Sequence, residues 1–472
     1  MPKHLYLLLL TCLVFFRPLA AQKRESLPLS TPVAGAPNAA PSSAILDDYI
    51  RLGLDSNLAL HQRNFDLQRS QLDLRRAKSL FFPQATVSSE YTLADGGRSI
   101  GIPIGDLLNN VYSTLNRLTA TDKFPQVANQ HVQFLPNNFQ DTKMEIALPI
   151  LNTDLQHNRE VNTERINESR ADRDIYARDL IRSIRQSYYQ FLQAGKAVEI
   201  YQSALQLAEE NKRVSEKFVE NQMATREIVI RAKAQISQVQ SSLIEAQNSV
   251  RNAAAFFNFL LNRPLDYPIT ADAVLMERAP IQPTSATLDR REELARLTSY
   301  RRILESNLKW DRGYLIPKLN AFYDVGFQGY GIHLNSSQFY QLAGVQLVWP
   351  LFKANDNKYR IRQALIDIQS VHEQYEQLAD QLSLEQTTAV NNYNSALEAL
   401  QALNDEVGSA RETYRLAERR FNEGQALQIE LIDSRNQMTS AELRYSLGRL
   451  ALLDRAADLE RVTAAFPINN QK

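Results

Sequence analysis

Residues 81–93 read FFPQATVSSEYTL, and residues 315–327 read LIPKLNAFYDVGF. In each stretch a proline follows two apolar residues and precedes a run in which apolar and polar side chains alternate. Alternation over about ten residues is typical of a β-strand that has one apolar face. The same Pro-flanked strand is therefore predicted twice, once in each half of the chain.

Two more pairs of matching segments follow these strands. LPIL at 148–151 returns as WPLF at 349–352, and each segment ends a second predicted strand and precedes a long polar helical stretch. EKFVENQ at 216–222 returns as RRFNEGQ at 419–425. Both halves then have the order helix, strand, strand, long helix, turn, helix, which indicates an internal duplication.

The duplication sets the predicted domain boundaries. Repeat 1 covers 45–265 and repeat 2 covers 287–463, with a linker at 266–286 and a tail at 464–472. The predicted strands are 84–94 and 142–151 in repeat 1, and 317–331 and 338–351 in repeat 2. The turns that end the long helices, called the tips below, are predicted near residues 221 and 424.

Two long helices are predicted, from 152 to about 217 and from 353 to about 420. At 1.5 Å per residue, each would be on the order of 100 Å long. Apolar and small residues recur along them at spacings of three and four, which is typical of helices that pack as coiled coils. The stripe is Phe191, Ala194, Val198, Tyr201, Leu205 and Ala208 in the first half, and Tyr375, Leu378, Leu382, Ala389, Tyr393, Ala396, Leu400, Leu403, Val407, Ala410, Tyr414, Ala417 and Phe421 in the second. Shorter helices, 224–261 and 427–462, are predicted to run back from the tips.

The N-terminus has the pattern of a secretory signal peptide. Lys3 and His4 precede the apolar run 5–16, and small residues at 19–21 provide a cleavage site, so residues 1–21 are predicted to be removed. The alternative is an ordinary buried helix. Residues 22–44 are rich in Pro, Ser and Ala and predict an extended leader.

Cys12 is the only cysteine, and it lies within the apolar run. The mature chain is therefore expected to have neither a disulfide nor a thiolate metal site. LLTC at 9–12 weakly resembles a lipoprotein cleavage site. Lipidation of Cys12 is thus an alternative, and it would tether the N-terminus to a membrane.

Composition and motifs exclude several functional classes. With 53 basic and 53 acidic residues the net charge is zero, which provides no electrostatic surface for nucleic acid. The six histidines form no HxxxH or HExxH pair, and neither a Gly-rich phosphate loop nor a GxSxG motif is present. The sequence therefore predicts no enzyme, no cofactor and no metal site.

The predicted strands fit either a membrane protein or a soluble protein. After the predicted signal peptide no run of about 18 apolar residues occurs, so no transmembrane helix is expected and a membrane protein would have to be a β-barrel. Open sheet edges are not tolerated in lipid, so chains with four strands each would have to pool them. The alternative is a pair of soluble β-hairpins that cover a core, because half-buried soluble strands alternate in the same way.

Taken in order, these features resemble the TolC-like outer membrane efflux proteins of Gram-negative bacteria over about 45–462. The resemblance rests on both Pro-flanked strands, on both LPIL-type segments, and on the tip motif Phe421-x-x-Gly424 that leads to Glu430 and Asp433. It implies a mainly α fold with membrane β: a coiled-coil helical barrel continuous with a 12-stranded β-barrel, built by a homotrimer with four strands per protomer. The implied location is the outer membrane lipid, with the helices reaching into the periplasm.

The same resemblance implies a function. Members of the family are exit ducts of tripartite efflux or type I secretion systems, and they dock onto a periplasmic adaptor that is coupled to an inner membrane transporter. Such a duct conducts passively and is gated at its periplasmic tips. The alternative function is a periplasmic coiled-coil adaptor or structural spacer, which would share the signal peptide and the heptads.

Acidic residues near the tips are the candidate gate. Glu430 and Asp433 match the positions at which family members form acidic rings, and three copies would place up to six carboxylates around a narrow axis. Glu227 is the only acid at the matching positions of repeat 1, because Ile230 stands where repeat 2 has Asp433. The alternative is exposed acids in the first turns of a helix, where the helix dipole favours them. The family often has Tyr where Phe421 stands here, so its latch contacts are not carried over.

The tip turns have their own candidate residues. Asn221 and Gly424 align, and both residue types accept a left-handed backbone, so each is predicted to turn its helix back. Phe218 and Phe421 precede them at matching positions.

The first hairpin carries an insertion at 96–138. The two prolines of the first hairpin, Pro83 and Pro149, are 66 residues apart, whereas Pro317 and Pro350 are 33 apart. The insertion contains a short helical pattern at 107–118. In a membrane-embedded hairpin it would lie outside the cell, as a structural cap or as a surface that binds a partner.

Overall fold

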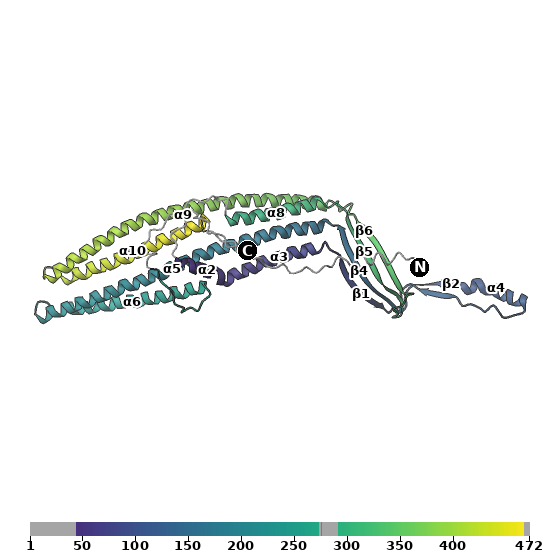
Figure 1. Cartoon of the computed structure of the whole chain (residues 1–472), viewed down its shortest axis with the longest axis horizontal. Coiled ribbons are helices and arrows are strands. Elements are labelled where there is room, and N and C mark those ends of the chain that lie inside the picture. The colour runs from purple at the N-terminus through teal and green to yellow at the C-terminus, as the bar shows by residue number, and fades with distance from the viewer. Residues whose placement is uncertain (1–43, 273–274, 276–290, 467–472) are drawn as a thin grey trace, which may run out of the picture. The chain divides into compact units, whose positions relative to one another are not determined.

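The computed structural model describes residues 44–272, 275 and 291–466. The predicted signal peptide, Cys12, nearly all of the leader, and parts of the predicted linker and tail lie outside these residues. Within them the chain is mainly helical, with one four-stranded and one two-stranded sheet (Figure 1). The mainly α fold class with strands is confirmed.

Each repeat has the predicted order of elements. Repeat 1 contains α2 (Ala44–Ser56), α3 (Leu58–Ser79), β1 (Gln84–Thr92), β4 (Phe139–Leu151), α5 (Thr153–Glu220) and α6 (Glu227–Leu260). Repeat 2 contains α8 (Glu292–Arg312), β5 (Lys318–Tyr330), β6 (Phe339–Val348), α9 (Asp356–Asn422) and α10 (Gln428–Val462). The first helix of repeat 1 is divided at Asn57, whose side chain caps α3 by accepting from the backbone N–H groups of Ala59 and Leu60 at 3.1 and 3.0 Å.

The insertion in the first hairpin folds as β2 (Ser99–Ile102), α4 (Ile104–Thr119) and β3 (Gln130–Gln133), with β2 and β3 paired. Asn109 fixes the segment that returns from α4, because its amide donates to the Val127 carbonyl at 3.0 Å and accepts from the Val127 N–H at 2.7 Å. The short strands were not predicted, since four residues are too few to show a period in sequence.

The larger sheet joins the two repeats. Its order is β1-β4-β5-β6 with every pair antiparallel, so β4 of repeat 1 lies beside β5 of repeat 2. Residues directly opposite one another share a face: Lys143 lies opposite Ser88 on one face, and Met144 lies opposite Val87 on the other. The sheet therefore has one polar and one apolar face, as the alternation predicts.

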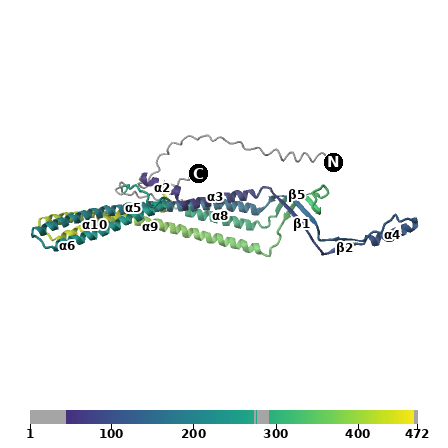
Figure 2. The same ribbon diagram turned by 90° about the horizontal axis from the view of Figure 1, so that it is seen from below.

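The helices form two antiparallel hairpins, α5 with α6 and α9 with α10, and α5 also packs against α10 (Figure 2). The main core lies where α2, α5, α6 and α10 meet, around the fully buried side chains of Ile50, Ile184, Tyr188, Phe257 and Leu261. Tyr188 is also anchored by its hydroxyl, which donates to the Thr270 carbonyl at 2.9 Å. No helix among the described residues is both long and apolar enough to cross a membrane.

The predicted stripe on α9 is buried or half-buried along its length, with Leu382, Tyr393 and Phe421 most enclosed. On α5 the prediction is only partly right. Its stripe is half-buried except for Ala208, whereas the enclosed residues are Leu192, Ile200, Ala204 and Ala208. The reason is that α5 packs against α3, α6, α8 and α10, so several of its faces are covered and no single stripe can be read from the sequence.

Candidate functional site: helix tips and the polar network between repeats

Both long helices end in the same hydrogen-bonded turn. The N–H of Met223 donates to the Phe218 carbonyl, and the N–H of Gln425 donates to the Arg420 carbonyl, each at 2.8 Å. This is the Schellman motif, in which the residue after the cap has a left-handed backbone.

The left-handed residues are Gln222, with φ of 60°, and Gly424, with φ of 71°. Gly424 was predicted, but the prediction for Asn221 is wrong, because Asn221 is the cap residue with φ of −85°. The helix of repeat 1 ends two residues after Phe218, whereas that of repeat 2 ends one residue after Phe421. Aligning the two tips on their aromatic residues therefore misplaces the turn by one position.

The two tips touch through the aromatic residues that were predicted at matching positions. The rings of Phe218 and Phe421 have centroids 5.4 Å apart and are tilted by 57°. Phe421 is only 4% exposed. The contact holds the end of the α5/α6 hairpin against the end of the α9/α10 hairpin.

A glutamine that sequence reasoning missed joins three helices at the tips. Gln428 is the first residue of α10 and is 6% exposed. Its amide donates to the Ser215 hydroxyl of α5 at 2.7 Å and to the Ile228 carbonyl of α6 at 3.0 Å. The available signal was Ser215, a polar residue seven positions after Ala208 on the buried face of α5. Two turns further along α10, Gln235 of α6 donates to Asn436 at 2.9 Å.

The predicted gate acids lie at the tips but are not brought into one cluster. Glu430 forms an ion pair with Arg420 at 3.5 Å, and both side chains are about half exposed. Asp433 is exposed and accepts from Gln437 at 2.7 Å, and Glu227 pairs with Arg231 of its own helix at 2.5 Å. Among the described residues no group of three or more acids, histidines or cysteines could hold a metal ion.

The interior just beyond the tips holds polar groups that are poorly satisfied. Arg435 of α10 is 2% exposed, and one of its terminal nitrogens has no hydrogen-bond partner among the described residues. Burial lowers the pKa of Arg435, and the nearby Tyr414 opposes this only in part. Neither polar atom of the buried Asn211 amide has a described partner. Such groups reduce the stability of the packing around them.

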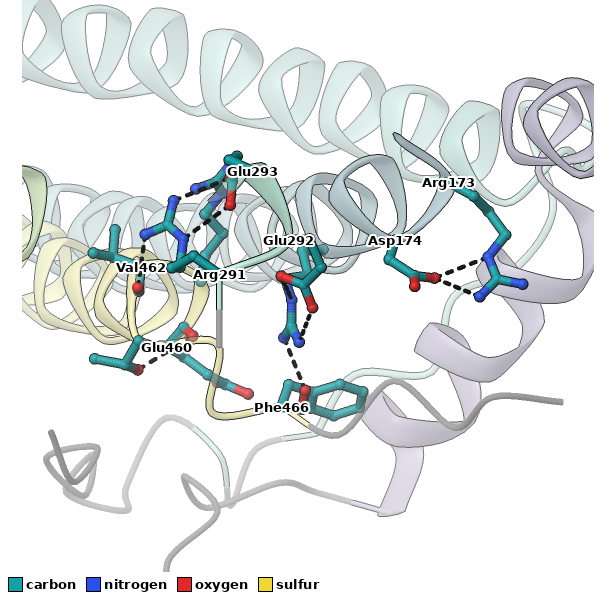
Figure 3. A network of polar contacts seen from close by, with 11 residues as sticks. Arg173, Asp174, Arg291, Glu292, Glu293, Glu460, Val462 and Phe466 are labelled. Atoms are coloured by element: carbon teal, nitrogen blue, oxygen red, sulfur yellow. Dashed lines mark hydrogen bonds and ion pairs between the residues drawn. The ribbon is translucent and has the colours of Figure 1, made fainter. Parts of the chain in front are cut away.

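A second polar region, shown in Figure 3, joins the repeats at the far end of α10. Arg178 of α5 donates hydrogen bonds to both carboxylate oxygens of Glu292 on α8, at 2.8 and 2.5 Å. It also donates to the Phe466 carbonyl at 2.9 Å. Bidentate pairs of this kind are among the stronger polar contacts in proteins. One side chain of repeat 1 thus binds both the first helix of repeat 2 and the start of the tail that follows repeat 2.

Arg291 and Glu293 extend this network (Figure 3). Arg291 is 2% exposed, holds both carboxylate oxygens of Glu293 at 3.0 Å, and donates to the Val462 carbonyl at 2.8 Å. Glu293 also pairs with Arg461 at 3.0 Å, and Arg461 reaches Asp179 of α5 at 2.8 Å. Burial acts to raise the pKa of Glu293, but the hydrogen bonds and charge of Arg291 outweigh it, so the pKa is lowered and the carboxylate stays ionised.

Two acids of α10 are less well compensated. Glu460 pairs with Arg185 at 2.8 Å, without hydrogen-bond alignment, and both side chains are almost fully buried. Burial raises the pKa of Glu460 despite the opposing charge of Arg185. Burial, with a smaller effect from Asp458, raises the pKa of Asp454 to about 6.

Comparisons with known proteins agree with this architecture. Residues 284–465 match the family model described as Outer membrane efflux protein. No curated protein matches the chain.

Three solved structures share the fold over most of the chain. The MtrE outer membrane channel of Neisseria gonorrhoeae, in its open state, is 17% identical, with 90% of this chain and 89% of MtrE covered and a TM-score of 0.71. The outer membrane protein VceC of Vibrio cholerae is 14% identical, with 89% and 95% covered and a TM-score of 0.68. The CmeC outer membrane channel of Campylobacter jejuni is 12% identical, with 93% and 94% covered and a TM-score of 0.67. At these identities the likeness establishes the fold.

The fold is that of outer membrane channels, with duplicated strand pairs followed by long helical hairpins. The match to the outer membrane efflux protein family covers residues 284–465, which include repeat 2, whereas the likeness to these channel structures extends over both repeats. The family is one of transport channels rather than enzymes.

Proposed function

We propose that three copies of the chain assemble into one exit duct, which docks by its tips onto a periplasmic adaptor coupled to an inner membrane transporter. The observation that carries the proposal is the open sheet. Its two edges, β1 and β6, have no partner strand among the described residues, and its apolar face is exposed at Val87, Val345 and Leu347. An open apolar sheet of this kind is unstable in water and in lipid alike.

Strand direction supports closure by further copies. The four strands alternate in direction, so β6 of one copy would meet β1 of the next copy antiparallel, as the pairs within the chain do. Three copies would then form a closed sheet of twelve strands whose apolar face contacts lipid. The long helices that follow β4 and β6 would be pooled in the same assembly.

The tips would form the gate of this duct. Glu430 and Asp433 of repeat 2 and Glu227 of repeat 1 lie at the ends of the hairpins and are exposed. Three copies would gather these carboxylates around one axis, where they attract cations and repel anions. The Phe218–Phe421 contact and the Gln428 hydrogen bonds would hold the two hairpins together at this end.

The assembly is tested by the native mass of the detergent-extracted protein, measured with and without heating, together with membrane fractionation. A heat-sensitive trimer in the outer membrane fraction supports the proposal, and a periplasmic monomer contradicts it. Protease access to 96–138 on whole cells would show whether the insertion lies outside.

The gate is tested by conductance in planar bilayers. We expect the double variant Glu430→Gln with Asp433→Asn to lose cation preference and sensitivity to cation block from the periplasmic side. Glu412→Gln is the matched control, because Glu412 is an exposed acid of α9 that is paired with Arg415 away from the turn. Unchanged selectivity in the double variant would exclude these residues from the gate.

A further inference from the structure

All charged side chains of the large sheet lie on one face. The four strands contain six charged residues, namely Glu90, Asp141, Lys143, Glu145, Lys318 and Asp324. The strand register places each of them on the polar face, the one that Ser88 and Lys143 share. The opposite face carries no charged residue within these strands. The two-residue period of the strands therefore places all six charged side chains on one face.

Three of these residues form a compact group at the centre of the sheet. Lys143 of β4 lies between two carboxylates, with its ammonium 3.3 Å from Asp324 of β5 and 3.8 Å from Glu145. Glu145 and Asp324 are directly opposite one another in the register. One cation therefore reduces the repulsion between two acids, and the group of three keeps one negative charge.

The remaining charges make this face acidic. Lys318 is paired with Asp154 of α5, so it does not offset the acids of the sheet. Glu90 and Asp141 lie opposite each other, and Asp141 accepts from the Tyr340 hydroxyl at 3.2 Å. Apart from the Lys318 pair, the strands thus present four carboxylates and one ammonium, a net charge of −3 for each copy.

A groove of about 540 Å³ opens onto the central group. Lys143, Glu145 and Asp324 line it, together with Asn320 and Gln346. Asp324 is 5% exposed, and its Oδ1 has no hydrogen-bond partner among the described residues. A carboxyl oxygen that has no described partner, in a side chain that lines a groove, can accept a contact from a cation.

We propose that Lys143, Glu145 and Asp324 form a second charge-selective site in the sheet-lined part of the conduit, with Lys143 masking two carboxylates from passing cations. The inference rests on the proposed assembly, in which the polar face lines the water-filled interior. Its ligands are small inorganic cations and protonated amines. Lys143 sets how strongly this zone prefers cations over anions.

The size of the effect follows from the charge that Lys143 carries. Replacing it by Met in three copies removes three positive charges and so leaves three more carboxylates uncompensated, screened over a Debye length of about 10 Å in 0.1 M salt. The added negative potential favours the passage of cations and opposes that of anions. The cation-over-anion permeability ratio should therefore rise about two- to three-fold. Lys143→Arg keeps the charge and should leave the ratio unchanged.

The test measures reversal potentials in a KCl gradient for Lys143→Met, Lys143→Arg and Glu145→Gln. We expect the ratio to rise for Lys143→Met and to fall for Glu145→Gln. Glu145 is about half exposed, so its variant should fold even if Lys143→Met does not. Unchanged ratios in Lys143→Met and Glu145→Gln, with conductance intact, would overturn the proposal.

Cysteine variants at two neighbouring positions distinguish a failure of this proposal from a failure of the proposed assembly. Cys12 is the only cysteine, so Ser88→Cys and Ser89→Cys can be made in a Cys12→Ser background. Ser88 shares the face of Lys143, whereas Ser89 lies opposite Thr142 on the other face. An anionic methanethiosulfonate reagent should alter the conductance of the first variant and not the second. The reverse pattern overturns the proposal, and a protein that forms no conducting trimer overturns the proposed function as well.

Discussion

Replacement of Gln428 by Ala is expected to loosen the tips. The substitution removes two hydrogen bonds, to the Ser215 hydroxyl at 2.7 Å and to the Ile228 carbonyl at 3.0 Å. Ser215 keeps its own bond to the Asn211 carbonyl at 2.7 Å, so it is not orphaned. The Oε1 atom of Gln428 is buried without a described partner, so its removal offsets part of this loss. At about 1 kcal/mol for each lost bond, the tip arrangement described here is destabilised by at most about 2 kcal/mol, or about 30-fold in its equilibrium with a separated arrangement.

The assay is single-channel recording in planar bilayers, supported by the sensitivity of cells to a large hydrophilic antibiotic. We expect Gln428→Ala to raise the open probability and the antibiotic sensitivity. Gln425→Ala is the matched control, because Gln425 is exposed in the same turn and contributes only its backbone to the Schellman motif.

A double-mutant cycle of Gln428→Ala with Ser215→Ala measures the contribution of the Gln428–Ser215 hydrogen bond. Coupling of about 1 kcal/mol between the two positions is expected if the hydrogen bond acts in the equilibrium that is measured. The reasoning would be refuted if Gln428→Ala conducts like the unmodified protein, or if Gln425→Ala has an equal effect.

Three further predictions concern stability, measured as the thermal midpoint of the detergent-solubilised protein. The pKa of Asp454 is raised to about 6, so its ionisation destabilises the folded state above that pH. Asp454→Asn should therefore raise the free energy of unfolding by about 1 to 2 kcal/mol at pH 7.5, after allowance for solvent exposure. This gain should vanish as the pH falls from about 6 to about 4. Arg185→Met leaves Glu460 buried and unpaired and should cost about 3 to 5 kcal/mol, whereas adding Glu460→Leu should restore most of it; equal midpoints for single and double variants would contradict this. Gln222→Gly should stabilise by up to about 1 kcal/mol and Gly424→Ala should destabilise by a similar amount, because both positions have a left-handed backbone; the same sign for both would contradict it.

The elements that the sequence predicted best are those with a long period. The alternation over ten residues and the three-and-four spacing over sixty are repeated many times, so a single exception does not hide them. The α9 stripe is predicted well because α9 packs mainly on α10 and α8, with one face enclosed. The α5 stripe is predicted less well because its neighbours surround it, and burial no longer follows one spacing.

The site was less predictable because its contacts cross between the repeats. Gln428 and Ser215 are 213 residues apart in sequence, and Arg178 and Glu292 are 114 apart. In sequence such residues are indistinguishable from the other polar side chains of a solvated helix. Glu430 and Asp433 were selected by resemblance, and the structure adds the Arg420 ion pair that no local pattern indicated.

The polar contacts divide the helical part into two zones of different strength. Near the far end of α10, Arg178, Arg291 and Arg461 each bind two or more partners and fix α5 to α8 and α10. Near the tips, Gln428 and one aromatic pair hold the hairpins, and buried polar atoms of Arg435 and Asn211 have no described partner. Local opening of a protein occurs first where its contacts are weakest. A duct built from this chain would therefore move at its tips while the ion pairs between the repeats remain formed.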